Sequence, residues 1–397
     1  MVRSFPKGFL WGTATASHQV EGSNHNNWSE WEKDSSHIAD KKPSGIACDH
    51  YHRYEQDLDL CASMGNNSHR FSLEWSRLEP KPGEWNEDGF LHYRNVLQAL
   101  AKRGLKPLVT LHHFTNPVWF EKQGGFLQAD SPPIFNRYVE KAVSKLGDLA
   151  DFWVTINEPV VYAYQGYVLG IWPPGRKNLG EARQVLRNLL KSHALAYRTL
   201  HDANSDAQVG IAKHVRIFDP LRPGNRMDRW AAKLYHKIFN SSVMTALATG
   251  IFPAPVGDNK VIPGLSGSQD FIGINYYTRG IIQFKLLNPG GLFACQTWKE
   301  GSARNSLGWE IYPDGLYRTI TEMKQYNLPI YITENGTTVD EDSLRLGYVH
   351  DHLEAIVRSL NAGALVRGYF YWSAMDNFEW AEGYTARFGL VDVDFKT

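Results

Sequence analysis

The 397-residue chain lacks several features that would assign it to a functional class directly. It carries no charge excess, because 42 Lys and Arg residues balance 42 Asp and Glu residues, so no basic surface is available for nucleic-acid phosphates or an anionic membrane. No uncharged stretch of about 18 residues suggests a membrane span, and the start of the chain, MVRSFPKGFLWG, has no apolar stretch typical of a signal peptide. The sequence therefore predicts a cytoplasmic protein with no nucleic-acid and no membrane partner.

Cysteine is scarce as well. Cys48, Cys61 and Cys295 are odd in number and far apart, so they predict neither a disulfide framework nor a C-x-x-C metal site, and we expect small buried hydrophobic residues. Aromatic residues, in contrast, make up 13% of the chain. Flat rings with polar edges suit a sugar-binding cleft, although a large core uses them too.

Short apolar or β-branched runs alternate along the chain with longer amphipathic segments. Eight runs are typical of strands: 10–17, 69–75, 106–113, 152–157, 208–214, 270–277, 329–335 and 366–373. Helical patterns occupy 51–65, 88–104, 132–150, 180–203, 228–250 and 340–363. This alternation predicts parallel strands joined by helical crossovers.

Eight such units favour an α/β fold of the (β/α)8 TIM barrel type over an open doubly wound sheet, because no G-x-G-x-x-G turn follows an early strand. No linker or low-complexity tract interrupts the chain, so residues 1–397 are expected to form a single domain. In such a barrel the functional side chains lie at the C-terminal ends of the strands.

Polar and aromatic side chains gather at these predicted strand ends: Gln19, Glu21, Arg70, His112, His113, Asn157, Glu158, Asn275, Tyr277, Glu334, Trp372, Glu379 and Trp380. The stretches TINEP and ITENG place Glu158 and Glu334 on the fourth and seventh strands, on opposite sides of an eight-stranded ring. Two facing carboxyl groups among aromatic and amide side chains are what glycoside hydrolysis requires. Taken singly, Glu158 fits a helix N-terminus or an ordinary ion pair, and Arg70 fits a partner of any acid in the barrel.

A metal site is the alternative raised by His112 and His113. Imidazoles at strand ends are common zinc ligands, but a third histidine with ligand spacing is missing, and His18 and His214 stand alone. We therefore expect no metal and no cofactor, and we expect His112 to be a packed, hydrogen-bonded residue.

The stretches FPKGFLWGTATASHQVEG, ACDHYHRYEQD, TINEP, GINYYT, YITENG and GYFYWSAMDNFEW together resemble glycoside hydrolase family 1, the β-glucosidase and β-galactosidase family, from residue 5 to near the C-terminus. The resemblance implies that Glu158 is the acid/base and Glu334 the nucleophile of a retaining mechanism, with carboxyl groups ~5 Å apart. It implies that Arg70 and Tyr277 hold the nucleophile ionised and that Asn157 binds the sugar 2-hydroxyl.

The resemblance also implies a substrate-binding set, in which Trp372 forms the floor under the sugar ring and Trp309 is the aglycone platform. The other members of the set are Gln19, His113, Asn275, Glu379 and Trp380. We expect an ionised Glu334 to raise the pKa of Glu158, and Arg70 to lower that of Glu334.

Three features depart from the family pattern. Phe114 and Thr115 replace a common Trp-Asp pair and His18 replaces an aromatic residue, changes that we expect to affect loop packing. Glu379 is not a departure: enzymes for 6-phosphorylated sugars usually carry Ser at this position, so Glu379 favours an unphosphorylated sugar. The sequence ends at Thr397, so the family's final barrel helix is either absent from the chain or omitted from the sequence.

The predicted function is that of a retaining, exo-acting β-glycosidase for small β-glucosides or short oligosaccharides, with β-galactosides and β-fucosides as secondary substrates. Two alternatives stay open. In one, transfer to a sugar acceptor dominates over hydrolysis. In the other, the barrel only binds sugar, which usually shows as loss of a catalytic Glu.

Overall fold

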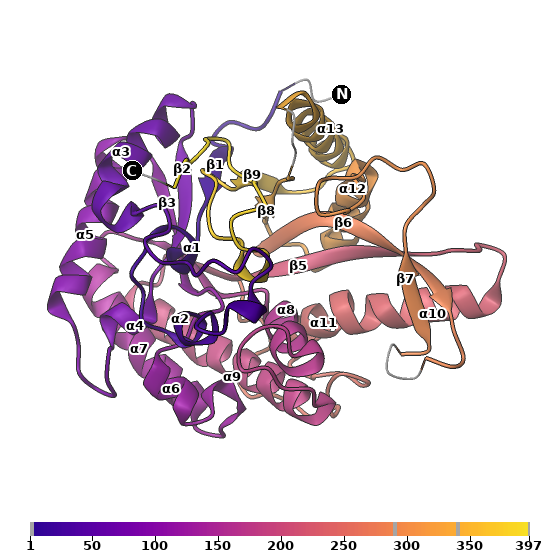
Figure 1. Cartoon of the computed structure of the whole chain (residues 1–397), viewed down its shortest axis with the longest axis horizontal. Helices are drawn as coiled ribbons and strands as arrows, with labels where there is room; N and C mark the ends of the chain where they lie inside the picture. Colours follow the sequence, from indigo (N-terminus) through magenta and orange to yellow (C-terminus); the bar gives the residue numbers. More distant parts are fainter. Residues whose placement is uncertain (1–3, 289–291, 339–341, 396–397) are drawn as a thin grey trace.

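The computed structural model describes residues 4–288, 292–338 and 342–395, which form a closed barrel of parallel strands surrounded by helices (Figure 1). The barrel strands are β1 (Leu10–Ala14), β2 (Ser68–Ser72), β3 (Lys106–His112), β4 (Phe152–Asn157), β5 (Gln208–Pro220), β6 (Ile272–Phe284), β8 (Ile330–Asn335) and β9 (Val366–Trp372). Their order is β5-β4-β3-β2-β1-β9-β8-β6, and β5 also pairs with β6, which closes the ring. The predicted (β/α)8 barrel is confirmed, and each predicted strand overlaps a barrel strand.

The fifth and sixth strands differ from the prediction. β5 and β6 are each 13 residues long, and Figure 1 shows them running beyond the barrel toward β7 (Ala294–Thr297) and α10 (Arg226–His236). β7 pairs antiparallel with β6, outside the ring. A four-residue strand is too short to show a periodic pattern, which explains why the sequence did not indicate it.

Helices follow the strands around the barrel. The longer ones are α3 (His50–Ser63), α5 (Glu87–Lys102), α7 (Ser131–Leu146), α9 (Leu179–Ala203), α10, α11 (Ser242–Thr249), α12 (Pro313–Met323) and α13 (Asp342–Asn361). The shorter ones are α1 (Ser17–Val20), α2 (Asn27–Trp31), α4 (Trp75–Leu78), α6 (Val118–Lys122) and α8 (Pro159–Tyr164). The predicted helix 228–250 is divided by the π-helix η4 (Lys237–Ser241), and residues 340 and 341 of the last predicted helix lie outside the described ranges.

After β9 the last helical element in the described part of the chain is η7 (Trp380–Glu382), and no barrel-closing α-helix follows it there.

The helix α7 illustrates how the outer layer covers the barrel. Phe135, Tyr138, Val139, Ala142 and Leu146 recur at intervals of three and four and are fully buried, whereas the intervening residues face outward or lie at the rim. Burying an apolar side chain of this size stabilises the fold by about 1.5–3 kcal/mol. The amphipathic period of this segment therefore corresponds to its buried side.

Gly336 directly follows β8 and explains the glycine of the ITENG stretch. A Cβ atom at this position would lie 1.8 Å from the carbonyl oxygen of Trp372, at the end of β9. Only glycine permits so close an approach of the two backbones. The residue therefore fixes how the C-terminal ends of β8 and β9 lie together.

The three cysteines are free, and only Cys61 is fully buried. The prediction of buried apolar residues is wrong for the other two. The Sγ of half-buried Cys48 donates a hydrogen bond to the Asp376 carbonyl at 3.1 Å, and Cys295 lies half-buried on the peripheral strand β7. Among the helices of the described ranges, none is both long and apolar enough to cross a membrane.

Candidate active site

Glu158 lies where the chain passes from β4 into α8. It is the N-cap of this helix, Pro159 occupies the first helical position, and the backbone of Glu158 has φ 45°, a left-handed conformation that is uncommon for a residue with a Cβ. Its N–H donates to the Ala212 carbonyl on β5 at 2.7 Å. This tight turn holds a buried carboxyl group at the C-terminal rim of the barrel, as the sequence predicts.

Glu334 lies on β8 and is held by two strong donors. The Arg70 guanidinium from β2 donates Nη1–H to Oε1 of Glu334 at 2.6 Å, and the Tyr277 hydroxyl from β6 donates to Oε2 at 2.6 Å. All three side chains are buried, and both oxygens of the carboxylate receive a hydrogen bond. The structure thus brings Arg70 and Tyr277 onto Glu334, as predicted.

Two amide side chains connect the carboxyl groups. Oδ1 of Asn157 accepts from Arg70 Nη2 at 2.7 Å and from Asn275 Nδ2 at 3.1 Å. The same Nδ2 of Asn275 donates to Oε1 of Glu158 at 2.7 Å. One buried hydrogen-bonded network therefore runs from Glu158 to Glu334 through Asn275, Asn157 and Arg70.

The pKa of Glu334 is raised to about 7, first because the carboxyl group is buried and also because of the charge of Glu158. Arg70 and the hydroxyl of Tyr277 act in the opposite direction on this pKa. Arg70 therefore has the predicted effect on Glu334, but burial outweighs it.

The pKa of Glu158 shows that the predicted direction is wrong. Burial acts to raise it, but the charge and hydrogen bond of His214, the amide of Asn275 and the charge of Lys213 outweigh burial, and the pKa of Glu158 is lowered. Nδ1 of His214 lies 3.1 Å from Oε1 of Glu158, a contact that no local sequence pattern indicated. The groups that lower the pKa of Glu158 thus lie on the neighbouring strands β5 and β6.

A second polar group lies at the ends of β1 and β9. Nε2 of Gln19 donates to Oε2 of Glu379 at 3.0 Å and to Oδ1 of Asn377 at 2.9 Å. Burial raises the pKa of Glu379 to about 8, and the charge of Glu334 adds to this effect. Oε1 of Gln19 is buried without a hydrogen-bond partner among the described residues. A buried acceptor of this kind is suited to a ligand hydroxyl.

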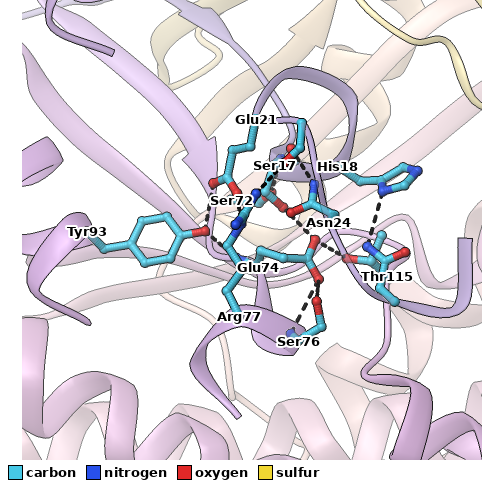
Figure 2. A network of polar contacts seen from close by, with 12 residues as sticks. Ser17, His18, Glu21, Asn24, Ser72, Glu74, Ser76, Arg77, Tyr93 and Thr115 are labelled. Atoms are coloured by element: carbon cyan, nitrogen blue, oxygen red, sulfur yellow. Dashed lines mark hydrogen bonds and ion pairs between the residues drawn. The ribbon is translucent and has the colours of Figure 1, made fainter. Parts of the chain in front are cut away.

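Gln19 lies just after β1, as predicted, on the short helix α1, and a polar network fixes that helix (Figure 2). The Ser17 hydroxyl donates to Glu74 at 3.1 Å, and Glu21 accepts from the Tyr93 hydroxyl at 2.7 Å and from Arg77 at 2.8 Å. Figure 2 shows these side chains converging on the segment that carries Gln19. Glu21, which the sequence placed at the site, is therefore part of this support.

Aromatic rings stack beside Glu379. The His113 ring lies parallel to those of Trp372 and Trp380, at centroid distances of 5.7 and 6.0 Å. His113 accepts a hydrogen bond from Nδ2 of Asn157 at 3.1 Å, and its Nδ1 is buried with no partner in the described ranges. Trp380 has a positive φ of 51°, as do few residues with a side chain. The predicted sugar-binding residues at the ends of β3 and β9 are thus brought together.

Trp309 lies apart from this stack. Its half-buried ring is 5.9 Å from the ring of Tyr277 and 6.1 Å from that of Phe388. It therefore neighbours Glu334 through Tyr277, on the β6 side of the barrel mouth.

The departures from the family pattern pack as expected. The ring of His18 stacks on Trp380 at 5.7 Å, and Phe114 contacts the same tryptophan edge-on at 5.2 Å. The Thr115 hydroxyl donates to Glu74 at 3.0 Å. His18 and Phe114 therefore pack against Trp380, and Thr115 belongs to the polar network around Glu74.

No group of three or more His, Cys, Asp or Glu side chains that could hold a metal ion occurs within the described residues. His112 is packed against Phe126, Phe135 and Tyr162, and its Nε2 bonds to Asn116 at 3.1 Å, which agrees with the predicted structural role.

Sequence reasoning missed two residues of the site. Asn377, which bonds to Gln19, belongs to the quoted stretch DNFEW and could have been selected there. His214 ends the predicted fifth strand, just as Asn157 ends the fourth, so its position at a strand end was a usable signal.

Comparison with known proteins agrees with this geometry. The model of the family described as glycosyl hydrolase family 1 matches residues 1–397. β-Glucosidase A of Acetivibrio thermocellus is 34% identical over 99% of this chain and 94% of its own. A solved β-glycosidase from Pyrococcus horikoshii is 40% identical, with a TM-score of 0.92 over 100% of this chain and 91% of that one. A β-glucosidase from Thermotoga maritima in complex with deoxynojirimycin is 30% identical, with a TM-score of 0.95 over 99% and 95%.

Proposed function

The chain belongs to glycosyl hydrolase family 1, and from this premise we propose that it is a retaining, exo-acting β-glycosidase that removes terminal β-D-glucosyl residues. The observation that carries the proposal is the pair Glu158 and Glu334, two buried carboxyl groups joined through Arg70, Asn157 and Asn275. For retention the two groups must lie ~5 Å apart, which stays a prediction.

In the first step Glu334 is the nucleophile. One carboxylate oxygen attacks the anomeric carbon, the bond from that carbon to the aglycone oxygen breaks, and Glu158 gives its proton to the departing oxygen. The reactive form of the pair thus has its one proton on Glu158 and its charge on Glu334. Arg70 and Tyr277 support that form, because both donate to Glu334 at 2.6 Å.

In the second step a water molecule replaces the aglycone. Glu158, now a carboxylate, takes a proton from this water, the water oxygen attacks the anomeric carbon, and the ester bond to Glu334 breaks. The sugar leaves with its original β configuration, and both carboxyl groups regain their starting protonation. Two successive inversions at one carbon therefore give net retention.

The substrate assignment is supported by the second polar group. Gln19 and Glu379 are already hydrogen-bonded to each other and can each bind a neighbouring sugar hydroxyl, while the parallel rings of His113, Trp372 and Trp380 offer flat apolar surface. Glu379 stands where enzymes for 6-phosphorylated sugars usually carry Ser, so we propose an unphosphorylated glucoside, with β-galactosides and β-fucosides as secondary substrates.

Azide tests the two roles separately. Glu334→Ala should lose hydrolysis of an aryl β-glucoside, and azide entering the vacated space should yield the α-glucosyl azide. Glu158→Ala should form the covalent intermediate from a substrate with a good leaving group, and azide should then yield the β-glucosyl azide. Glu322→Ala is the matched control, because this half-exposed carboxylate pairs with His236 at 3.0 Å outside the barrel mouth.

Two results would contradict the proposal. One is an equal rate of hydrolysis in the wild type and in both Glu variants. A barrel that only binds sugar would give this result as well. The other is α-glucose as the first product of the wild type, seen by proton NMR before mutarotation. Product analysis at high acceptor concentration separates hydrolysis from transfer.

We also propose that residues 1–397 form one catalytic domain, because the barrel strands from β1 to β9 belong to a single sheet. The cytoplasmic location and the lack of nucleic-acid and membrane partners stay predictions from composition, and fractionation of expressing cells tests the first.

A further inference from the structure

His214 contacts the acid/base residue of the proposed reaction from β5. Its Nδ1 lies 3.1 Å from Oε1 of Glu158, and 16% of its side chain is exposed. The ring is 5.7 Å from that of Tyr277 and meets Phe239 of η4 edge-on at 5.4 Å. The imidazole is thus enclosed by aromatic rings, with one nitrogen directed at the carboxyl group.

His214 and Asn275 act as a pair. They are register partners on the adjacent strands β5 and β6, and both reach Oε1 of Glu158, at 3.1 and 2.7 Å. Within the ranges 4–288, 292–338 and 342–395, no hydrogen bond from a protein group reaches Oε2 of Glu158. One oxygen is therefore held by two donors and the other is left for a ligand.

We propose that His214 is a positioning residue that, together with Asn275, fixes the carboxyl plane of Glu158 so that Oε2 is the oxygen that exchanges a proton with the aglycone oxygen and then with water. This inference rests on the function proposed above. It assigns separate tasks to the two oxygens of one carboxyl group. It also adds a residue from β5 to a site whose predicted residues all lie on or after other strands.

The backbone of His214 is itself anchored by its neighbour. Lys213 is fully buried, and its Nζ donates to the carbonyl oxygens of His214 and Phe239, the latter at 2.6 Å. Because successive residues of a strand point to opposite faces, Lys213 lies behind β5 while His214 faces the barrel mouth. The buried amine thus ties β5 to η4 and limits how far the imidazole can move.

The charged and titratable groups that act on Glu158 come from three sides. His214 and Lys213 lie on β5, Tyr277 lies on β6, and Glu334 lies on β8. Of these, His214 is the group that both bonds to Glu158 and, in the proposed reaction, contacts neither the sugar nor the nucleophile. Its removal should therefore change the behaviour of Glu158 selectively.

Loss of the imidazole should raise the pKa of Glu158, because a hydrogen bond to the ionised form is lost while burial is unchanged. In His214→Leu, the pH profile of kcat/KM for 4-nitrophenyl β-glucoside should move upward by about half to one pH unit, less than for a short, fully buried bond to a carboxylate, because this bond is 3.1 Å long and the imidazole is partly exposed. Below the shifted pKa, kcat for 2,4-dinitrophenyl β-glucoside should fall about threefold to tenfold, because water attack needs Glu158 as an ionised base.

A second readout separates positioning from general damage. Cleavage of the dinitrophenyl substrate needs no proton from Glu158, so its kcat/KM should not fall in His214→Leu, whereas a distorted site would lower it. His214→Gln, which keeps a donor, should return the pH profile toward that of the wild type. His236→Leu is the matched control, because His236 pairs with Glu322 outside the mouth at 3.0 Å and should change neither readout.

The inference is overturned if the pH profile of His214→Leu stays within about 0.2 pH units of the wild-type profile. It is also overturned if kcat/KM of this variant for the dinitrophenyl substrate falls below the wild-type value. His214→Ala takes the place of the Leu variant if that variant does not fold, as judged by thermal unfolding. A wild type that releases no dinitrophenol would instead refute the proposed function.

Discussion

Tyr277→Phe isolates one hydrogen bond to the proposed nucleophile. The variant keeps the ring and its packing but removes the hydroxyl that donates to Oε2 of Glu334 at 2.6 Å. Hydrogen bonds to charged groups contribute about 1.5–3 kcal/mol, and one pKa unit corresponds to about 1.4 kcal/mol, so the pKa of Glu334 should rise by about one to two units. From a value of about 7, it should reach ~8 to ~9.

The sign of the effect follows from the ionised form being the nucleophile. At pH 7 the ionised fraction of Glu334 should fall from about one half to between a tenth and a hundredth, which lowers kcat/KM about 5-fold to 50-fold. The loss should diminish as the pH rises, because the ionised fraction of the variant recovers. The assay is kcat/KM for 2,4-dinitrophenyl β-glucoside between pH 5 and pH 10, since this leaving group needs no proton from Glu158.

Tyr276→Phe is the control for this measurement. Tyr276 is the neighbouring buried tyrosine, and its hydroxyl donates to the Tyr312 carbonyl at 2.7 Å, away from the carboxyl pair. Its pH profile should match that of the wild type. The reasoning is refuted if Tyr277→Phe loses the same factor at every pH, or if its apparent pKa moves downward or by less than about half a unit.

Three further substitutions test other parts of the site. Arg70→Met leaves Glu334 as a buried carboxylate without its cation, so urea denaturation should show a loss of about 3–5 kcal/mol in the free energy of unfolding; a loss below about 1 kcal/mol would contradict this. Tyr93→Phe leaves the buried N–H of Glu74 without its acceptor, and should cost about 1–3 kcal/mol and raise KM through Gln19; an unchanged unfolding midpoint would argue against that role. Glu379→Gln should lower kcat/KM roughly 10-fold or more for a β-glucoside but much less for a β-xyloside, which has no 6-hydroxyl, and equal losses would remove Glu379 from sugar binding.

Much of the fold could be predicted from the sequence because strands and helices have local periods. All eight barrel strands and the long helices α3, α5, α7 and α9 overlap the predicted ranges. Predictions near the barrel mouth were poorer. The first predicted strand ends early and continues as α1, and β5 and β6 run on past their predicted ends, since neither change alters the residue pattern enough to be seen.

The residues Glu158 and Glu334 were identifiable because their motifs are short and contiguous in the chain. Their pKa directions were not, since these depend on partners that are distant in sequence: His214 is 56 residues from Glu158 in the chain, and Asn377 is 358 residues from Gln19. Burial and charge act through space, so a prediction that considered only the charges of Glu334 and Arg70 omitted the larger effects.

The sequence by itself determined the eight barrel strands, the long helices and the two carboxyl groups, because backbone periodicity and short motifs are encoded locally. Only the tertiary structure decided the register of β5 against β6, which places His214 beside Asn275 and brings both onto one oxygen of Glu158. That contact depends on the register between two strands, and a register is fixed only when the whole barrel packs.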